Sequence, residues 1–182
     1  VRGPLVSFPP QHIIDAVKRA ADEGVIAVTL LGQNVNQYGQ DAGSMPFHEL
    51  LDACSRVPGI ARLGFLTSHP RDFSDQTIAV IRNSSVITTG IHLPLQSGSN
   101  RILAAMNRGY TAERYLELVR TVQSLPDSAV TTDMIVGFPG ETEEDFAATM
   151  EAVNAAGFAD AFMYAYSPRT GTAAAAYTDQ VD

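Results

Sequence analysis

Five short apolar runs alternate with amphipathic segments along the chain. The runs expected to be strands cover residues 25–31, 61–66, 87–93, 129–136 and 158–165. The segments between them have apolar residues at helical spacing, over residues 11–23, 46–56, 74–82, 111–125 and 142–155, with a shorter helix from about residue 100. Strands that alternate with helices form a parallel sheet, because a parallel connection needs a long crossover. The sequence therefore predicts an α/β fold with parallel strands.

The loops that follow the five expected strands are rich in Gly, Ser, Asn and Gln. They read GQN, TSHP, PLQSGS, GFPGE and YSPRTGT, whereas the connections from helix to strand are plainer. A β/α barrel places its ligand at the carboxyl ends of its strands, while a doubly wound sheet does so only at a switch point. Five such loops favour a barrel-like curl. Because five strands do not close a barrel and the chain starts on a helix, we expect a partial, TIM-like barrel without its first strand.

Composition narrows the class of protein. The 182 residues suffice for one domain with a core, and no apolar run reaches the roughly 18 residues of a membrane span. A net charge of −8 disfavours non-specific binding to nucleic acid, so an RNA partner would need a local basic patch. The single cysteine excludes an internal disulfide and is compatible with the cytosol. We expect no membrane partner and no metal ligands in this chain.

Five segments, in order, resemble the radical S-adenosylmethionine methylthiotransferases. They are residues 30–39, 66–70, 92–111, 131–146 and 166–174, and together they cover nearly the whole chain. The resemblance is greatest to the subgroup that adds a methylthio group to C2 of N6-isopentenyladenosine beside the tRNA anticodon. The ribosomal-protein methylthiotransferases, the nearest alternative, differ at the GQN and SHP loops. The resemblance implies a monomeric cytoplasmic enzyme that binds S-adenosylmethionine, [4Fe-4S] clusters and tRNA.

One departure from that family concerns the cluster ligands. The family holds a [4Fe-4S] cluster with three thiolates of a CxxxCxxC loop, and this chain has no such motif. Arg2-Gly3 resembles the Arg-Gly that follows the loop, so we expect the last cysteine just upstream of Val1. The N-terminal auxiliary-cluster domain and the C-terminal RNA-binding domain are also absent from residues 1–182. We interpret the chain as a partial radical SAM core, inactive alone, with no catalytic residue of its own.

Six residues are candidates for binding S-adenosylmethionine: Gln33, Ser68, Gln96, Ser97, Arg108 and Asp133. Gln96 and Ser97 suit the ribose hydroxyls and the amino-acid group, although Ser97 equally suits the turn itself. Arg108 offers a cation to the cofactor carboxylate, or is a surface charge at a helix end. Asp133 lies in an apolar strand and needs a partner, which is either a ligand or a structural ion pair.

The assignment of Gln33 and Ser68 as cofactor contacts rests on weaker arguments. Gln33 stands where related radical enzymes of this fold have a Gly-Glu pair that binds the methionine amino group, and its amide offers a carbonyl oxygen instead. Ser68 ends a strand beside His69, and a lone histidine is more often structural than functional. Tyr164 and Tyr166 face either an RNA base or the protein interior. Each of these residues therefore has a functional and a structural interpretation.

Two other classes of function remain open at this stage. A lyase or hydrolase of barrel fold would use acid–base chemistry by Asp133, Glu141 or His69, and would act in air without iron. A non-catalytic binding module would keep the barrel, and its native gene would encode no cluster loop. Iron content and the sequence upstream of residue 1 discriminate these classes from the radical enzyme.

Overall fold

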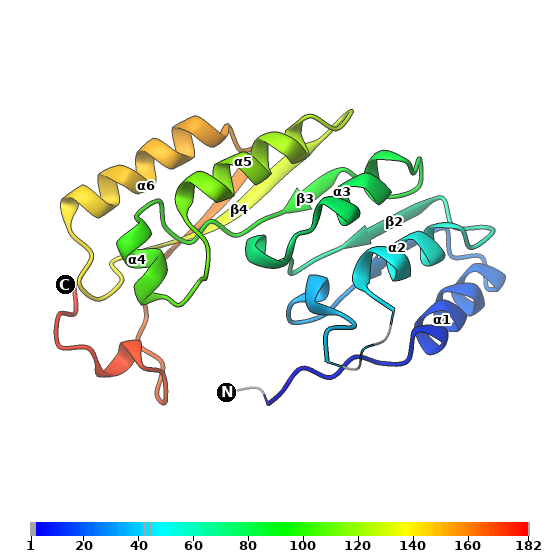
Figure 1. The fold of residues 1–182 in the computed structure, drawn as a ribbon, viewed down its shortest axis with the longest axis horizontal. Helices are drawn as coiled ribbons and strands as arrows, with labels where there is room; N and C mark the ends of the chain where they lie inside the picture. The colour runs from blue at the N-terminus through cyan, green and yellow to red at the C-terminus, as the bar shows by residue number, and fades with distance from the viewer. Residues whose placement is uncertain (1–2, 42, 44, 182) are drawn as a thin grey trace. The chain divides into compact units, whose positions relative to one another are not determined.

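The computed structural model describes residues 3–41, 43 and 45–181, and helices alternate with strands as the sequence predicts (Figure 1). The helices are α1 (Pro10–Asp22), α2 (Phe47–Ser55), α3 (Asp75–Arg82), α4 (Asn100–Ala105), α5 (Ala112–Gln123) and α6 (Glu143–Ala156). The strands are β1 (Ala27–Leu30), β2 (Arg62–Phe65), β3 (Gly90–His92), β4 (Ala129–Val136) and β5 (Asp160–Ala165). Short 3-10 helices are η1 (Val35–Gln37), η2 (Pro70–Asp72) and η3 (Ala174–Ala176).

The described residues form two compact units. The N-terminal unit contains residues 3–91 together with 125–127, and the C-terminal unit contains residues 92–124 and 128–181. Val1 and Arg2, next to which the cluster loop is expected, lie outside the described residues. Among the helices of residues 3–41, 43 and 45–181, none combines the length and apolar character that crossing a membrane requires.

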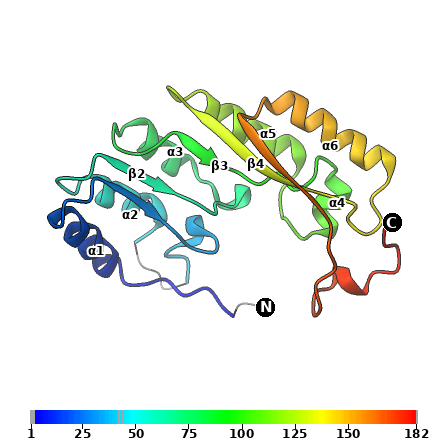
Figure 2. The same cartoon turned by 180° about the vertical axis from the view of Figure 1, so that it is seen from behind.

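The N-terminal unit is built on the parallel pair β1 and β2. Their register runs from Ala27 opposite Arg62 to Leu30 opposite Phe65. Helix α2 buries its apolar side on β2, and the rings of Phe47 and Phe65 meet edge-on at 5.3 Å. Within this unit the helices cover one side of the strands, and Figure 2 shows the strands from the opposite side. The carboxyl ends of β1 and β2 carry the GQN and TSHP loops.

The C-terminal unit is built on β4, which pairs in parallel with β5 in the order β3-β4-β5. Alternate β4 residues are buried against the helices, as shown by a 3.3 Å contact between the hydroxyls of Thr132 and Tyr115. The Tyr115 hydroxyl donates to the Leu93 carbonyl at 2.7 Å, which ties α5 to the chain after β3. The other β4 row, which includes Asp133, points to the opposite side of the sheet and is partly exposed.

Four of the five strands are shorter than the sequence predicts, and only β4 has the predicted bounds. The expected strand 87–93 reduces to Gly90–His92, and Ile87 makes a single parallel bridge to Leu63. The hydrogen-bonded strands consequently form one sheet of two strands and one of three, and the described residues form no closed barrel. The prediction of an α/β fold with parallel strands is confirmed.

Candidate functional site

Gln96 lies at the point where the chain leaves β3 and turns towards α4. Its backbone N–H donates to the Asp133 carbonyl at 2.8 Å, and its carbonyl accepts from the Ile135 N–H at 3.0 Å. Its φ is +70°, in the left-handed region that residues other than glycine rarely adopt. Such a conformation persists only where its surroundings enforce it, and it is commonest at functional sites. The two hydrogen bonds to β4 provide that constraint.

Gln96 lines a cavity of about 570 Å³ at the carboxyl ends of β4 and β5. The wall of this cavity is formed by Gln96, Asp133, Ile135, Tyr164, Tyr166 and Arg169, with further residues of the loop after β5. The volume falls in the range of pockets that enclose small ligands, roughly 300–1,000 Å³. Apolar and aromatic walls with an amide, a carboxylate and a guanidinium are typical of a site for a polar organic molecule.

A second cavity, of about 330 Å³, shares four lining residues with the first, which are Gln96, Ile135, Thr172 and Ala174. Its other walls include Met106, Arg108 and Phe138. The Arg108 Nε is buried and has no hydrogen-bond partner among the described residues. A buried N–H without an acceptor is unfavourable, and an anionic ligand group would satisfy it. The position of Arg108 thus fits the predicted pairing with a carboxylate.

Asp133 has a protein partner and also lines a cavity, so its contact with a ligand stays a prediction. Its Oδ2 lies 3.2 Å from the His92 Nε2, so the carboxylate has a protein partner. The other ring nitrogen of His92, Nδ1, lies 3.0 Å from the Thr131 hydroxyl. Asp133 nevertheless lines the larger cavity. An imidazole that donates from Nε2 fixes one carboxylate oxygen and leaves the other for a ligand.

Ser97 has the environment of a residue that shapes the turn. It is 0% exposed, and its hydroxyl accepts from the Ser99 N–H at 3.1 Å. The same hydroxyl lies 3.3 Å from the Thr149 hydroxyl of α6. This geometry favours the turn interpretation of Ser97 over direct contact with a ligand.

Gln33 and Ser68 belong to the N-terminal unit, whereas the other four candidates belong to the C-terminal unit. Gln33 is exposed and lines a cavity of about 320 Å³ together with segments 4–8 and 31–38. Ser68 is buried, and its hydroxyl has no partner among the described residues. The loops that carry them are joined, because the Thr67 hydroxyl donates to the Gly32 carbonyl and the His69 N–H donates to the Asn36 side chain at 3.1 Å.

Sequence reasoning missed part of the cavity wall. Phe138, Ala174 and Tyr177 line the smaller cavity. Phe138 is packed between two tyrosine rings, at 5.3 Å from Tyr166 and 6.3 Å from Tyr177. The Ala-rich segment after residue 172 has no polar pattern that marks a site, so only the folded chain identifies it.

Comparison with known proteins decides the family. The profile of the Radical SAM superfamily matches residues 1–153. The chain belongs to the radical SAM superfamily. It is 47% identical over its whole length to a protein of Natranaerobius thermophilus, 48% to one of Saccharopolyspora erythraea and 50% to one of Caldicellulosiruptor saccharolyticus. Each of these is named tRNA-2-methylthio-N(6)-dimethylallyladenosine synthase. The chain spans 41%, 37% and 39% of their respective lengths.

Two solved structures have a similar fold. The chain resembles Streptococcus suis SuiB bound to S-adenosylmethionine, with a TM-score of 0.61 and 18% identity over 98% of this chain and 37% of that one. It also resembles the radical methyltransferase TsrM of Kitasatospora setae, with a TM-score of 0.68 and 17% identity over 86% of this chain and 31% of that one. The sequence-based resemblance to this superfamily is confirmed.

Proposed function

We propose that this chain is the S-adenosylmethionine-binding core of a tRNA methylthiotransferase. The full-length enzyme would add a methylthio group to C2 of N6-isopentenyladenosine beside the anticodon. The observation that carries the proposal is the alignment of the whole chain, at 47–50% identity, with proteins named for that product. The two cavities that meet at Gln96 support it, because they combine apolar walls with an amide, a carboxylate and the guanidinium groups of Arg108 and Arg169.

The roles of the C-terminal candidates follow from their chemistry. Arg108 would pair with the cofactor carboxylate, since its buried Nε needs an acceptor. Gln96 would hydrogen-bond the ribose hydroxyls, and Asp133 would accept from the ammonium group or from a hydroxyl. Bound S-adenosylmethionine would supply the radical chemistry of the superfamily, and these residues would bind it and orient it. In the N-terminal unit, Gln33 and Ser68 remain predicted cofactor contacts.

The residues present do not fit a [4Fe-4S] cluster. A cluster of this kind needs thiolates, and the single cysteine, Cys54, is 0% exposed within α2. Cluster ligation is therefore assigned to cysteines outside residues 1–182, in agreement with the expected upstream loop. No step of the reaction is assigned to Cys54.

The proposed macromolecular partner is tRNA. The net charge of −8 disfavours a broad phosphate-binding surface on this chain. Tyr164, Tyr166 and Arg169 in the wall of the larger cavity could instead contact a single base taken out of its stack. The proposal places the enzyme in the cytoplasm as a monomer, with most of the tRNA contacts made by other parts of the protein.

Binding of S-adenosylmethionine to the full-length enzyme, reconstituted without oxygen, tests the proposal. We expect Gln96→Ala to weaken binding about 10-fold, which corresponds to loss of roughly one strong hydrogen bond. Gln40→Ala, at an exposed glutamine, is the matched control and should bind as the wild type does. The wild type should also convert tRNA that carries isopentenyladenosine to the methylthio product. Absence of S-adenosylmethionine binding by the wild type would contradict the proposal and favour a different class of barrel protein.

A further inference from the structure

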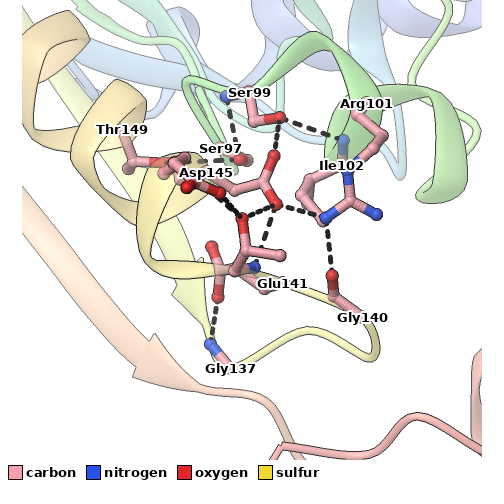
Figure 3. A network of polar contacts seen from close by, with 11 residues as sticks. Ser97, Ser99, Arg101, Ile102, Gly137, Gly140, Glu141, Asp145 and Thr149 are labelled. Atoms are coloured by element: carbon pink, nitrogen blue, oxygen red, sulfur yellow. Dashed lines mark hydrogen bonds and ion pairs between the residues drawn. The ribbon is translucent and has the colours of Figure 1, made fainter.

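An ion pair outside the two cavities connects the segments that line them. Arg101 lies in α4 and Asp145 in α6, and neither lines the cavities described above. The Asp145 side chain is only 10% exposed, whereas that of Arg101 is 57% exposed. Figure 3 shows the pair at the centre of a network that also includes Ser99 and Gly140. The ion pair therefore joins α4, which follows β3, to α6, which follows β4.

The Asp145 carboxylate is hydrogen-bonded to the N-cap residues of two helices. Its Oδ1 accepts from the Ser99 hydroxyl at 2.5 Å, and Ser99 is the N-cap of α4. Its Oδ2 accepts from the Thr142 N–H at 2.9 Å and from the Thr142 hydroxyl at 2.8 Å, and Thr142 is the N-cap of α6. Arg101 Nη2 donates to the same Oδ2. The carboxylate is thus fully engaged, and it fixes the start of α4 against the start of α6.

Arg101 extends the network to a third segment. Its Nη2 also donates to the Gly140 carbonyl at 2.6 Å, in the loop after β4. The Gly140 N–H donates to the Asp179 carbonyl at 2.7 Å, so that loop is joined to the segment after η3. The three connected segments are those that supply Gln96, Phe138 and Tyr177 to the cavity walls. A displacement at the ion pair would therefore move several walls of the site.

The turn after Gln96 is in addition packed directly on α6. The Gly98 N–H donates to the Thr149 hydroxyl at 2.9 Å. The contact is so close that a Cβ at Gly98 would lie 2.4 Å from the Ala148 carbonyl oxygen. Between Gln96 and the Asp145–Ser99 bond there are only two residues. The strained backbone of Gln96 is therefore held from β4 on one side and from α6 on the other.

We propose that Arg101 and Asp145 are positioning residues for the ligand site, acting on S-adenosylmethionine through the turn of Gln96 and the loop of Phe138. This inference rests on the proposed function, because it takes S-adenosylmethionine as the occupant. Burial raises the pKa of Asp145, but hydrogen bonds from Arg101, Ser99 and Thr142 outweigh burial and hold that pKa below its usual range. The ion pair is therefore permanent at neutral pH, as a fixed support of a site requires.

The test compares S-adenosylmethionine affinity with thermal stability in the full-length, cluster-loaded enzyme. Arg101→Met and Asp145→Asn each remove the ion pair and should weaken binding about 10-fold, measured well below the thermal midpoint of each variant. The double variant should be little worse than either single variant, because the two residues act as one unit. Arg101→Lys keeps the cation and should recover part of the affinity. Glu117→Gln, in the exposed Arg114–Glu117 pair of α5, is the control and should bind normally.

The outcomes separate this inference from the proposed function. If the wild type binds S-adenosylmethionine and Arg101→Met binds it equally well, the ion pair only stabilises the fold and the inference is wrong, whatever its effect on the midpoint. If the wild type does not bind, the proposed function itself fails. Should Asp145→Asn not fold, Arg101→Met still decides, because Arg101 is largely exposed and its replacement leaves the Ser99 and Thr142 hydrogen bonds in place.

Discussion

Gly98 shows how a single residue without a side chain controls the turn that carries Gln96. The atoms nearest to a Cβ at this position are the Ala148 carbonyl oxygen at 2.4 Å and the Thr149 Cα at 2.6 Å. Both belong to the backbone of α6, which cannot rotate away as a flexible side chain would. Glycine is therefore required here by the approach of the helix and by the Thr149 hydrogen bond that this approach permits.

We expect Gly98→Ala to lower the free energy of unfolding by about 1–3 kcal/mol, since the methyl group must push the turn away from α6. The loss should appear as a lower midpoint in urea with an unchanged slope. Gly90→Ala is the matched control, because a Cβ at Gly90 meets no atom within 4 Å. Equal midpoints for the two variants would show that α6 does not constrain the turn.

Residue-scale predictions from the sequence succeed where the determinant is local. The polar turn at Gln96 was predicted from its neighbours, and the structure places Gln96 in the walls of both cavities. The role of Ser97 was left open, because it depends on Thr149, which lies 52 positions away in the chain. The role of Asp133 depends in the same way on His92, which lies 41 positions away in the chain. A linear pattern carries no information on such partners.

At the scale of elements, helix starts follow the sequence closely. The helices predicted from residues 74 and 142 begin at the N-caps Ser74 and Thr142, and each side chain accepts a hydrogen bond from the backbone N–H three residues later. Asp145 completes a capping box with Thr142. The ends of strands are predicted less well from the sequence, because the length of a strand depends on the strand with which it pairs. Thr88 and Thr89 lie outside β3 although β-branched residues favour strands, and the Thr88 N–H donates to the Leu63 carbonyl of β2 at 2.9 Å.

The connection of two helix starts through Asp145 predicts a particular dependence of stability on pH. A carboxyl group whose folded pKa is depressed stabilises the fold fully above its unfolded pKa of about 3.9 and loses that effect as pH falls towards the folded pKa. We expect the difference in unfolding free energy between the wild type and Asp145→Asn to be constant from about pH 8 to pH 5. Below about pH 4 the difference should shrink.

Denaturant titrations of the two proteins across this range measure that difference. Glu117→Gln provides the comparison, because its carboxylate lies in an exposed pair and should contribute little at any pH. A difference that increases as pH falls, or one that already changes between about pH 8 and pH 5, would mean that Asp145 is not held as a charged group in the folded chain.

At the scale of the whole chain, alternation of helices and strands was sufficient to predict the fold class. The pattern could not predict that hydrogen bonding would divide the strands into two sheets, because sheet continuity depends on pairing between residues far apart. Nor could it predict η3, since an Ala-rich stretch gives no signal for a cavity wall. The superfamily is recognised from motifs that are spread over several helices, strands and loops, so no single element identifies it.

The composition of the whole chain also determines what it can do with iron. Cys54 is its single cysteine, and burial raises the pKa of this thiol to about 11. Because iron–sulfur clusters are bound by thiolates, a buried neutral thiol is a poor ligand.

We expect residues 1–182, treated with ferrous iron and sulfide without oxygen, to retain no stoichiometric iron. A Cys54→Ala version should give the same iron count, whereas the full-length protein should bind about four iron atoms per cluster. Recovery of about four iron and four sulfide by the 182-residue chain, lost on Cys54→Ala, would assign a cluster to this chain and contradict the placement of the ligands upstream.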